Sequence, residues 1–193
     1  MKHTILSGSS RKNSISLRVS KALERVLMEQ GENEVEVVSF EDYDIPFFNH
    51  DFDPDNLTPF QLRLTNAMRS GHTIIFVTPE YNWFPSAEMV HLVHRLGDTP
   101  FRDLWQEKVL SFVGVSNGRG GRMPTVQMGY VVDKLISVFG FESLTNPKSF
   151  EVEFAHLVLD EKGRSTGNAD FDRGLKAFVD YHIRLSQRWK SAH

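Results

Sequence analysis

The sequence predicts an α/β protein in which helices cover both faces of a doubly wound, five-stranded parallel sheet. Strand-like and helix-like segments alternate five times along the chain, and no linker, repeat or low-complexity segment divides it. The run Val109–Val115 is almost continuously apolar, which is typical of a parallel strand buried on both faces. The 193 residues therefore fit one domain that spans residues 1–193.

The expected strands and helices follow from the spacing of apolar residues and from the glycines and prolines that interrupt it. Strands are expected at residues 4–7, 35–40, 72–78, 109–115 and, as a short strand, 141–144. Helices are expected from residue 14 until Gly31, and over 58–70, 85–97, 124–139 and 171–191. In the helix after residue 14, for example, apolar residues recur three or four positions apart, which predicts an amphipathic helix.

Two segments lack this regularity. Residues 43–55 form a long, aromatic-rich connection, and residues 146–168 are the least regular part of the chain. Within the latter, residues 151–155 could form a strand, and Asp160-Glu161-Lys162-Gly163 predicts a turn, so a small hairpin is one alternative.

Composition excludes several classes of function. The net charge is −3 and the sequence pI is about 6.2, so there is no basic excess to attract nucleic acid. The chain has no cysteine, which leaves no disulfide, thiolate metal site or cysteine nucleophile. The N-terminus has no signal-peptide pattern, and no apolar run approaches the roughly 18 residues of a transmembrane helix. We therefore expect a soluble cytoplasmic protein without a membrane partner.

Two histidines, His91 and His94, are spaced i, i+3 on an expected helix. No further ligand stands at a suitable spacing, so surface or interface positions are favoured over a metal site, and we expect no metal.

Three chemically rich loops follow the first, third and fourth strands of the expected sheet: residues 8–14, 79–85 and 116–123. Parallel strands end at the same edge of a sheet, and ligands of doubly wound folds bind there. The order of the elements thus predicts that these three loops converge on one binding site.

The first loop, Gly8-Ser9-Ser10-Arg11-Lys12-Asn13-Ser14, leads from a strand into a helix. Its small residues allow backbone N–H groups to face a ligand, its hydroxyls can donate hydrogen bonds, and an arginine can pair with a phosphate. This pattern favours a phosphate site. The alternative is a simple helix cap by Asn13 or Ser14 with a solvated Arg11. The loop matches neither the P-loop nor the G-x-G-x-x-G fingerprint.

The other two loops are less specific when each is taken alone. Thr78-Pro79-Glu80-Tyr81-Asn82-Trp83 ends a core strand with groups that a turn does not need, which indicates a held ligand. Ser116-Asn117-Gly118-Arg119-Gly120-Gly121-Arg122 could approach a flat ligand closely through its glycines, or it could be a flexible connection with two solvated arginines.

Taken together, the loops resemble the NADPH-dependent FMN reductase family, a branch of the flavodoxin-like fold that includes quinone, azo-dye and chromate reductases. G-S-S-R-K-N-S is similar to the family's G-S-x-R-x-x-S, T-P-E-Y-N to its flavin loop, and S-N-G-R-G-G-R to its third loop. The segment Asp44-Ile45-Pro46-Phe47-Phe48-Asn49-His50-Asp51 also resembles the family. The resemblance covers about residues 4–139, and it implies the strand order 2-1-3-4-5.

The resemblance implies an FMN-dependent NAD(P)H oxidoreductase that passes a hydride from NADPH or NADH, through FMN, to a small-molecule electron acceptor. Because the flavin carries this chemistry, no catalytic side chain is expected. The residues implied at the FMN phosphate are Ser9, Arg11, Ser14, Ile15 and Ser16. Those implied along the ring system and ribityl chain are Pro79, Glu80, Tyr81 and Asn82. Those implied at the other edge of the ring are Ser116, Gly118, Arg119, Gly120 and Gly121. A homodimer or homotetramer is also implied.

The sequence departs from the family after Asn82, where Trp83-Phe84-Pro85 stands in a loop that is one residue shorter. The following helix lacks the Lys-Asn pair and the Asp-Trp of relatives. Bulky Trp83 and Phe84 predict a narrowed acceptor site. The alternatives to a reductase are a flavodoxin-like electron carrier and a non-catalytic protein of the same fold.

Overall fold

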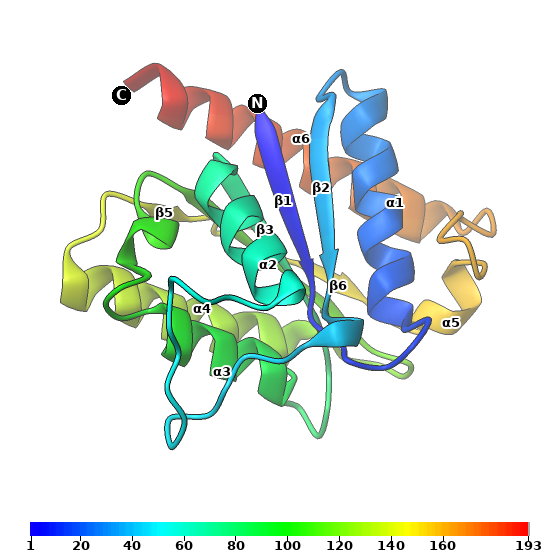
Figure 1. The fold of residues 1–193 in the computed structure, drawn as a ribbon. Helices are drawn as coiled ribbons and strands as arrows, with labels where there is room; N and C mark the ends of the chain where they lie inside the picture. Colours follow the sequence, from blue (N-terminus) through cyan, green and yellow to red (C-terminus); the bar gives the residue numbers. More distant parts are fainter. Residues whose placement is uncertain (193) are drawn as a thin grey trace.

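A parallel sheet forms the centre of the computed structural model, which describes residues 1–192 (Figure 1). Its strands are β1 (Lys2–Ser7), β2 (Glu34–Ser39), β3 (Thr73–Pro79), β4 (Val109–Val115), β5 (Leu144–Thr145) and β6 (Phe150–Val152). Along the sheet the order is β2-β1-β3-β4-β5, and every pair is parallel. This confirms the flavodoxin-like order 2-1-3-4-5.

The fifth strand position is divided between two short strands. β5 pairs with the start of β4 at Val109 and Leu110, and β6 pairs with its end at Val113–Val115. Between them, the backbone N–H of Asn146 donates to Leu110 O at 2.7 Å, and its side chain turns inward to Ser111 Oγ at 3.0 Å. Pro147 follows and cannot donate to a ladder. The strand expected at 141–144 therefore starts later, and the segment expected at 151–155 adds to the same edge of the sheet as β6. The turn expected at 160–163 is found, and an antiparallel bridge between Leu159 and Ser165 spans it, as in the small hairpin alternative.

The helices are α1 (Ile15–Glu29), α2 (Pro59–Ser70), α3 (Ala87–Leu96), α4 (Arg122–Phe139), α5 (Ala155–Val158) and α6 (Ala169–Ala192), with two 3-10 turns, η1 (Phe40–Asp42) and η2 (Arg102–Trp105). The expected bounds of the five longer helices are confirmed within about two residues. Caps fix several of these ends. Thr58 and Gln61 form a reciprocal capping box before α2, with Pro59 in the first turn.

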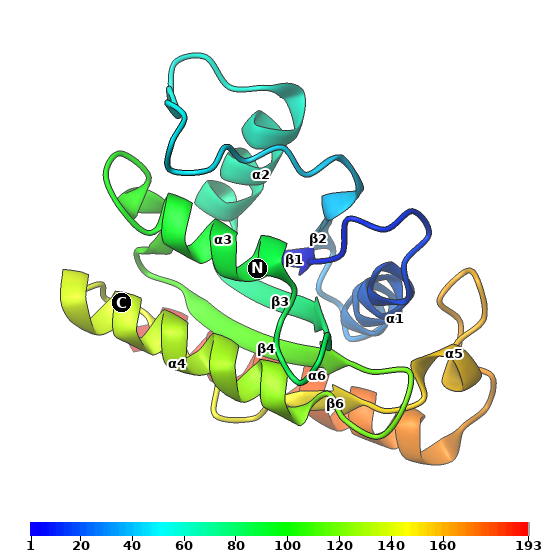
Figure 2. The same cartoon turned by 90° about the horizontal axis from the view of Figure 1, so that it is seen from below.

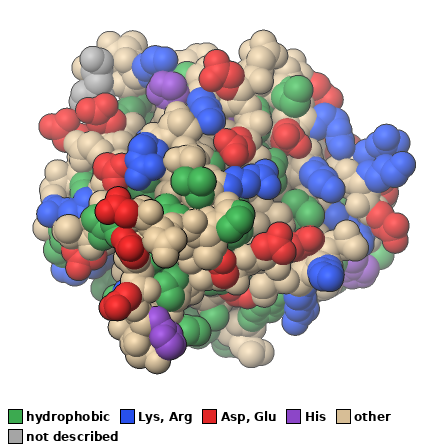
Figure 3. All heavy atoms as spheres, in the orientation of Figure 1, with side chains coloured by type: hydrophobic (Ala, Val, Ile, Leu, Met, Phe, Trp, Pro, Cys, Tyr) green, Lys and Arg blue, Asp and Glu red, His purple; other side chains and the backbone are tan. Residues whose placement is uncertain are grey.

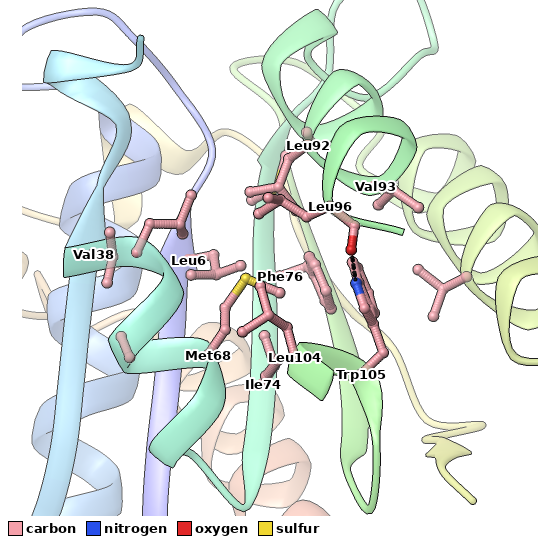
Figure 4. Close-up of a cluster of buried hydrophobic side chains, with 14 of the residues drawn as sticks. Leu6, Val38, Met68, Ile74, Phe76, Leu92, Val93, Leu96, Leu104 and Trp105 are labelled. Carbon is pink, nitrogen blue, oxygen red and sulfur yellow. Dashed lines mark hydrogen bonds between the residues drawn. The ribbon is translucent and has the colours of Figure 1, made fainter. Parts of the chain in front are cut away.

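One face of the sheet is covered by α2, α3 and α4. Leu6, Ile74 and Phe76 point into this layer and are fully buried. Trp105 closes the layer beside Phe76, and its indole N–H donates to Leu96 O at 2.6 Å (Figure 4). Burying each such side chain stabilises the fold by roughly 1.5–3 kcal/mol.

The opposite face of the sheet is covered by α1, α5 and α6. Ile5, Ile75 and Val77 point to this side, because successive residues of a strand face opposite ways. Leu23 of α1 and Phe178 of α6 complete the layer and are fully buried. Two cores thus clamp the sheet, which holds the ends of its strands in fixed positions.

A buried polar network lies under α6, within the amino-terminal half of the strands. His182 Nδ1 is 2.8 Å from Ser111 Oγ, and its Nε2 is 3.2 Å from both His3 Nδ1 and Thr73 Oγ1. Burial, followed by the nearby His3, lowers the pKa of His182 to about 3. Burial also lowers the pKa of His3, although Glu32 opposes that shift. The two rings therefore stay neutral at physiological pH.

The surface mixes charges of both signs. Lysines and arginines alternate with aspartates and glutamates over the face shown in Figure 3. Among residues 1–192, no helix has the length and apolar character needed to cross a membrane.

Candidate functional site

The three loops predicted from the sequence lie together at the carboxyl ends of the strands. Figure 2 views the molecule from this end, where the loops after β1, β3 and β4 meet beyond the sheet. The parallel pairing of β3 with both β1 and β4 fixes this arrangement. The convergence expected from the order of elements is therefore found in the structure.

The first loop ends at the N-terminus of α1. Ser14 is the N-cap, and its hydroxyl accepts a hydrogen bond from the backbone N–H of Leu17 at 3.1 Å. The N–H groups of Ile15 and Ser16 belong to the first turn, where a helix offers them no acceptor, and the helix dipole favours an anion there. Ser14 thus caps the helix, as in the capping alternative. This cap leaves the N–H groups of Ile15 and Ser16 available to a phosphate.

Hydrogen bonds tie the first loop to the second. The hydroxyl of Ser86, the N-cap of α3, donates to Gly8 O at 2.5 Å, and its backbone N–H donates to Thr78 Oγ1 at 3.1 Å. A Cβ at Gly8 would collide with the Met89 side chain. Glycine at the point where the chain leaves β1 therefore lets Met89 of α3 pack closely against the loop.

Side chains of the two loops also meet. The buried Ser9 places its Oγ 3.4 Å from the Tyr81 hydroxyl, and the Arg11 guanidinium lies over the Tyr81 ring at 4.9 Å from the centroid. Ser10 is hydrogen-bonded to Glu88 of α3. Three of the predicted site residues, Ser9, Arg11 and Tyr81, are thus brought into contact.

The second loop closes as a tight turn. Tyr81 N–H donates to Phe84 O at 2.9 Å and Phe84 N–H to Tyr81 O at 3.0 Å, while Asn82 and Trp83 have φ values of 52° and 69°. Two successive positive φ values are those of a type I′ turn. The loop, one residue shorter than in the family, closes through this turn, which places Trp83 in the left-handed backbone region. Trp83 and Phe84 are 72% and 62% exposed.

The third loop folds back over the end of β4. A Cβ at Gly114 would overlap the backbone of Gly121, and a Cβ at Gly120 would overlap the Glu80 carboxylate. Glu80 bridges the second and third loops, because its Oε2 accepts the Gly121 N–H and its own N–H donates to Val115 O at 2.8 Å. Glycine is therefore required on both sides of this crossing.

The remaining predicted residues lie at the same edge of the sheet. Ser116 donates its backbone N–H to Val152 O at 2.9 Å, and Gly118 O accepts the Phe154 N–H at 3.0 Å. Arg119 and Asn82 are exposed. Pro79 is buried as the last residue of β3.

Sequence reasoning missed three residues that shape the site. Ser86 and Glu88 join the first loop to α3, and Glu153 accepts the Gly120 N–H at 3.2 Å. Ser86 could have been predicted as a helix cap, because it follows Pro85 at the start of an expected helix and serine is a common N-cap. No sequence pattern pointed to Glu153, because it lies in the least regular segment of the chain.

Of the two histidines of α3, His91 contacts the aromatic-rich connection of residues 43–55. The hydroxyl of Tyr43 is 2.8 Å from His91 Nδ1, and the Phe47 ring lies 4.6 Å from the His91 ring. Burial, with Arg95 as the next cause, lowers the pKa of His91. Within residues 1–192, no cluster of three or more histidines and carboxylates is arranged to hold a metal.

Comparison with known proteins identifies the class. The family model described as NADPH-dependent FMN reductase matches residues 1–136, which is most of the chain. The chain belongs to the NADPH-dependent FMN reductase family. The resemblance inferred from the three loops is confirmed.

Solved structures agree with the fold. FerB from Paracoccus denitrificans, a flavoenzyme NAD(P)H:(acceptor) oxidoreductase, superposes with a TM-score of 0.74 at 18% identity, over 97% of both chains. Oxidised flavodoxin 1 from Bacillus cereus superposes with a TM-score of 0.58 at 11% identity, over 95% of this chain and 98% of its own. At such identities the likeness is one of fold.

A curated relative from Mycoplasma pneumoniae, described as uncharacterized, is 34% identical over 86 residues. The match covers 45% of this chain and 48% of that relative, so it spans about half the length of either protein.

Proposed function

We propose that this chain is a single-domain cytoplasmic enzyme that transfers a hydride from NADPH or NADH, by way of bound FMN, to a small oxidised acceptor such as a quinone, azo compound or flavin. The observation that carries the proposal is the joining of the three loops. Ser9 and Arg11 contact Tyr81, and Glu80 of the same Tyr81 loop contacts Gly121. One ligand that carries a phosphate and a flat ring fits such a combination.

The donors of the site fit FMN. Its phosphate would be held by the N–H groups of Ile15 and Ser16 and by the side chains of Ser9, Ser14 and Arg11. Pro79, Glu80, Tyr81 and Asn82 would lie along the ring and ribityl chain. Ser116, Gly118, Arg119, Gly120 and Gly121 would lie at the opposite edge, where the absence of side chains at the glycines permits close approach.

The flavin, when bound, supplies the redox chemistry by accepting and donating the hydride. The residues of this chain bind and orient it. Trp83 and Phe84 project from the rim of the site and would limit the size of the acceptor. Replacing both by alanine would then widen the range of acceptors, and unchanged acceptor range would contradict this role.

We also propose a homodimer or homotetramer, and the exposed apolar surface beside the site supports a homodimer. A pocket of about 430 Å³ lies between the Tyr81 loop, α3 and α4, and its walls are largely apolar. Phe84, Val126 and Tyr130 line it and are 62%, 53% and 74% exposed in the single chain. Large exposed apolar patches mark interaction sites, and a second copy could bury this one by two-fold pairing. Light scattering tests this proposal. The wild type should be a dimer and Tyr130→Glu a monomer, whereas a monomeric wild type would overturn it.

The visible absorption spectrum tests the enzymatic proposal. We expect purified protein to bind FMN and the bound flavin to bleach anaerobically on addition of NADPH or NADH. Bound flavin that neither coenzyme reduces would favour an electron carrier. No uptake of FMN would favour a non-catalytic protein of the same fold.

A further inference from the structure

The glycine-rich loop of residues 116–121 is bound on its outer side by a segment that the family model does not cover. That segment comprises residues 151–155, which include the end of β6 and the start of α5, whereas the matched residues end at 136. Its backbone makes three hydrogen bonds with the loop, from Ser116 N–H to Val152 O, from Phe154 N–H to Gly118 O and from Ala155 N–H to Ser116 O, at 2.9–3.0 Å.

Side chains complete this contact. Glu153 Oε1 accepts the Gly120 N–H at 3.2 Å, while Glu80 Oε2, from the opposite side, accepts the N–H of the next residue, Gly121. Glu151 Oε1 lies 3.9 Å from Arg122 Nη1, directly after them. Two carboxylates, one after β3 and one between β6 and α5, therefore accept hydrogen bonds from two consecutive N–H groups of one loop.

Both glycines have positive φ values. Gly120 has φ 154° and Gly121 has φ 93°, a region that residues with side chains rarely adopt. A glycine-rich loop has many alternative conformations when free, so fixing one of them has an entropic cost. Hydrogen bonds to ionised carboxylates are about twice as strong as neutral ones, and they can offset that cost before any ligand arrives.

We propose that Glu153 is a positioning residue for the flavin site, which together with Glu80 holds Gly120 and Gly121 in the conformation that receives the ring. The inference rests on the proposed FMN function. It extends the functional site to a segment outside the matched part of the chain, and it gives that segment a defined task.

The test compares substitutions at Glu153 with a matched control. Glu153 is exposed and borders an open pocket of about 420 Å³, so its replacement leaves the core intact. Glu153→Ala removes the acceptor, and Glu153→Gln keeps a neutral one. Glu161→Gln makes the same change of charge in the exposed turn at residues 160–163.

The first readout needs no flavin. In ¹H–¹⁵N spectra of the flavin-free protein, the Gly120 amide proton should move upfield in Glu153→Ala and partly in Glu153→Gln, and should stay in place in Glu161→Gln. The amide of Ser116, which is bound by backbone, should stay in place in all three. An unchanged Gly120 amide in Glu153→Ala would overturn the proposal.

The second readout is the dissociation constant of FMN, measured by quenching of flavin fluorescence. Loss of one hydrogen bond that orders the loop should raise it about three- to tenfold in Glu153→Ala, with partial rescue in Glu153→Gln. An equal rise in Glu161→Gln, or none in Glu153→Ala, would overturn the positioning role. If the wild type takes up no FMN, both the proposed function and the role of Glu153 in flavin binding fail. The Gly120 amide signal still decides whether the hydrogen bond to Glu153 exists.

Discussion

The two ends of the sheet use polar groups in opposite ways. Toward the amino ends of the strands, His3, Thr73, Ser111 and His182 are fully buried and bonded to one another beneath α6. At the carboxyl ends, the polar groups lie on loops, and the first-turn N–H groups of α1 remain directed at whatever binds there. The buried network at the amino ends, whose members bond to one another, stabilises the fold. The polar groups at the carboxyl ends are arranged for a ligand.

This contrast teaches where substitutions should act. A change in the buried network leaves buried donors and acceptors without partners, so it should lower the free energy of unfolding. At the carboxyl ends, a change at an exposed residue such as Arg11 alters a group that water can solvate when no ligand is bound. It should therefore lower flavin affinity with little effect on stability.

The largest effect is expected for His182→Ala. The substitution removes a fully buried ring and leaves Ser111, Thr73 and His3 short of a partner. The free energy of unfolding in urea should fall by about 3 kcal/mol or more. FMN affinity of the folded fraction should change less than about twofold, which is less than the loss of a typical hydrogen bond would cause. A loss below about 1 kcal/mol would show that the network is not a source of stability.

Acid should lower the free energy of unfolding through the buried network at the amino ends of the strands. Burial lowers the folded-state pKa of His182 from 6.5 to about 3, so the folded protein binds fewer protons than the unfolded chain between these values. The stability that the protein has with a neutral His182 is fully present above pH 6.5 and is lost as the pH falls below it. At pH 5 this residue alone should lower the free energy of unfolding by about 2 kcal/mol.

Chemical denaturation at pH 7 and pH 5 measures the acid effect, and the NMR titration of the His182 ring assigns it. Protonation of that ring in the folded protein near pH 6.5 would contradict the account.

At the carboxyl ends, Arg11→Ala should raise the dissociation constant of FMN about tenfold or more, because a charge-assisted bond to the phosphate is lost. Lys12→Ala is the control, since Lys12 is an exposed neighbour with the same charge. It should change the affinity by less than about threefold, as a solvated surface charge does. Equal effects of the two substitutions would mean that general attraction, not the geometry of Arg11, binds the phosphate.

The smallest expected effect is a gain. Trp83 has φ 69° and is 72% exposed, so its side chain adds little packing to a left-handed backbone that costs roughly 1–2 kcal/mol. Trp83→Gly should raise the free energy of unfolding by up to about 1 kcal/mol. Trp83→Ala keeps the unfavourable φ and should bring no gain. Thermal unfolding of both variants decides, and destabilisation by glycine would show that the indole packs against something that the single chain lacks.

Much of this arrangement could be read from the sequence, because the relevant physics is local. Apolar spacing gave the helix bounds within about two residues, and the alternation of elements placed three loops at one edge. The division of the fifth strand could not be predicted, since it depends on Asn146 reaching Ser111 across 35 positions. Glu153 was missed for the same reason, because its partner Gly120 is 33 positions away.

The most direct test of the central claim is a ¹H–¹⁵N titration of the protein with FMN. The account predicts that the amides of residues 8–16, 80–84 and 116–121 shift together, while those of His3, Thr73, Ser111 and His182 stay in place. Shifts centred on the amino ends of the strands, or no shifts at saturating FMN, would contradict the assignment of the carboxyl ends as the flavin site.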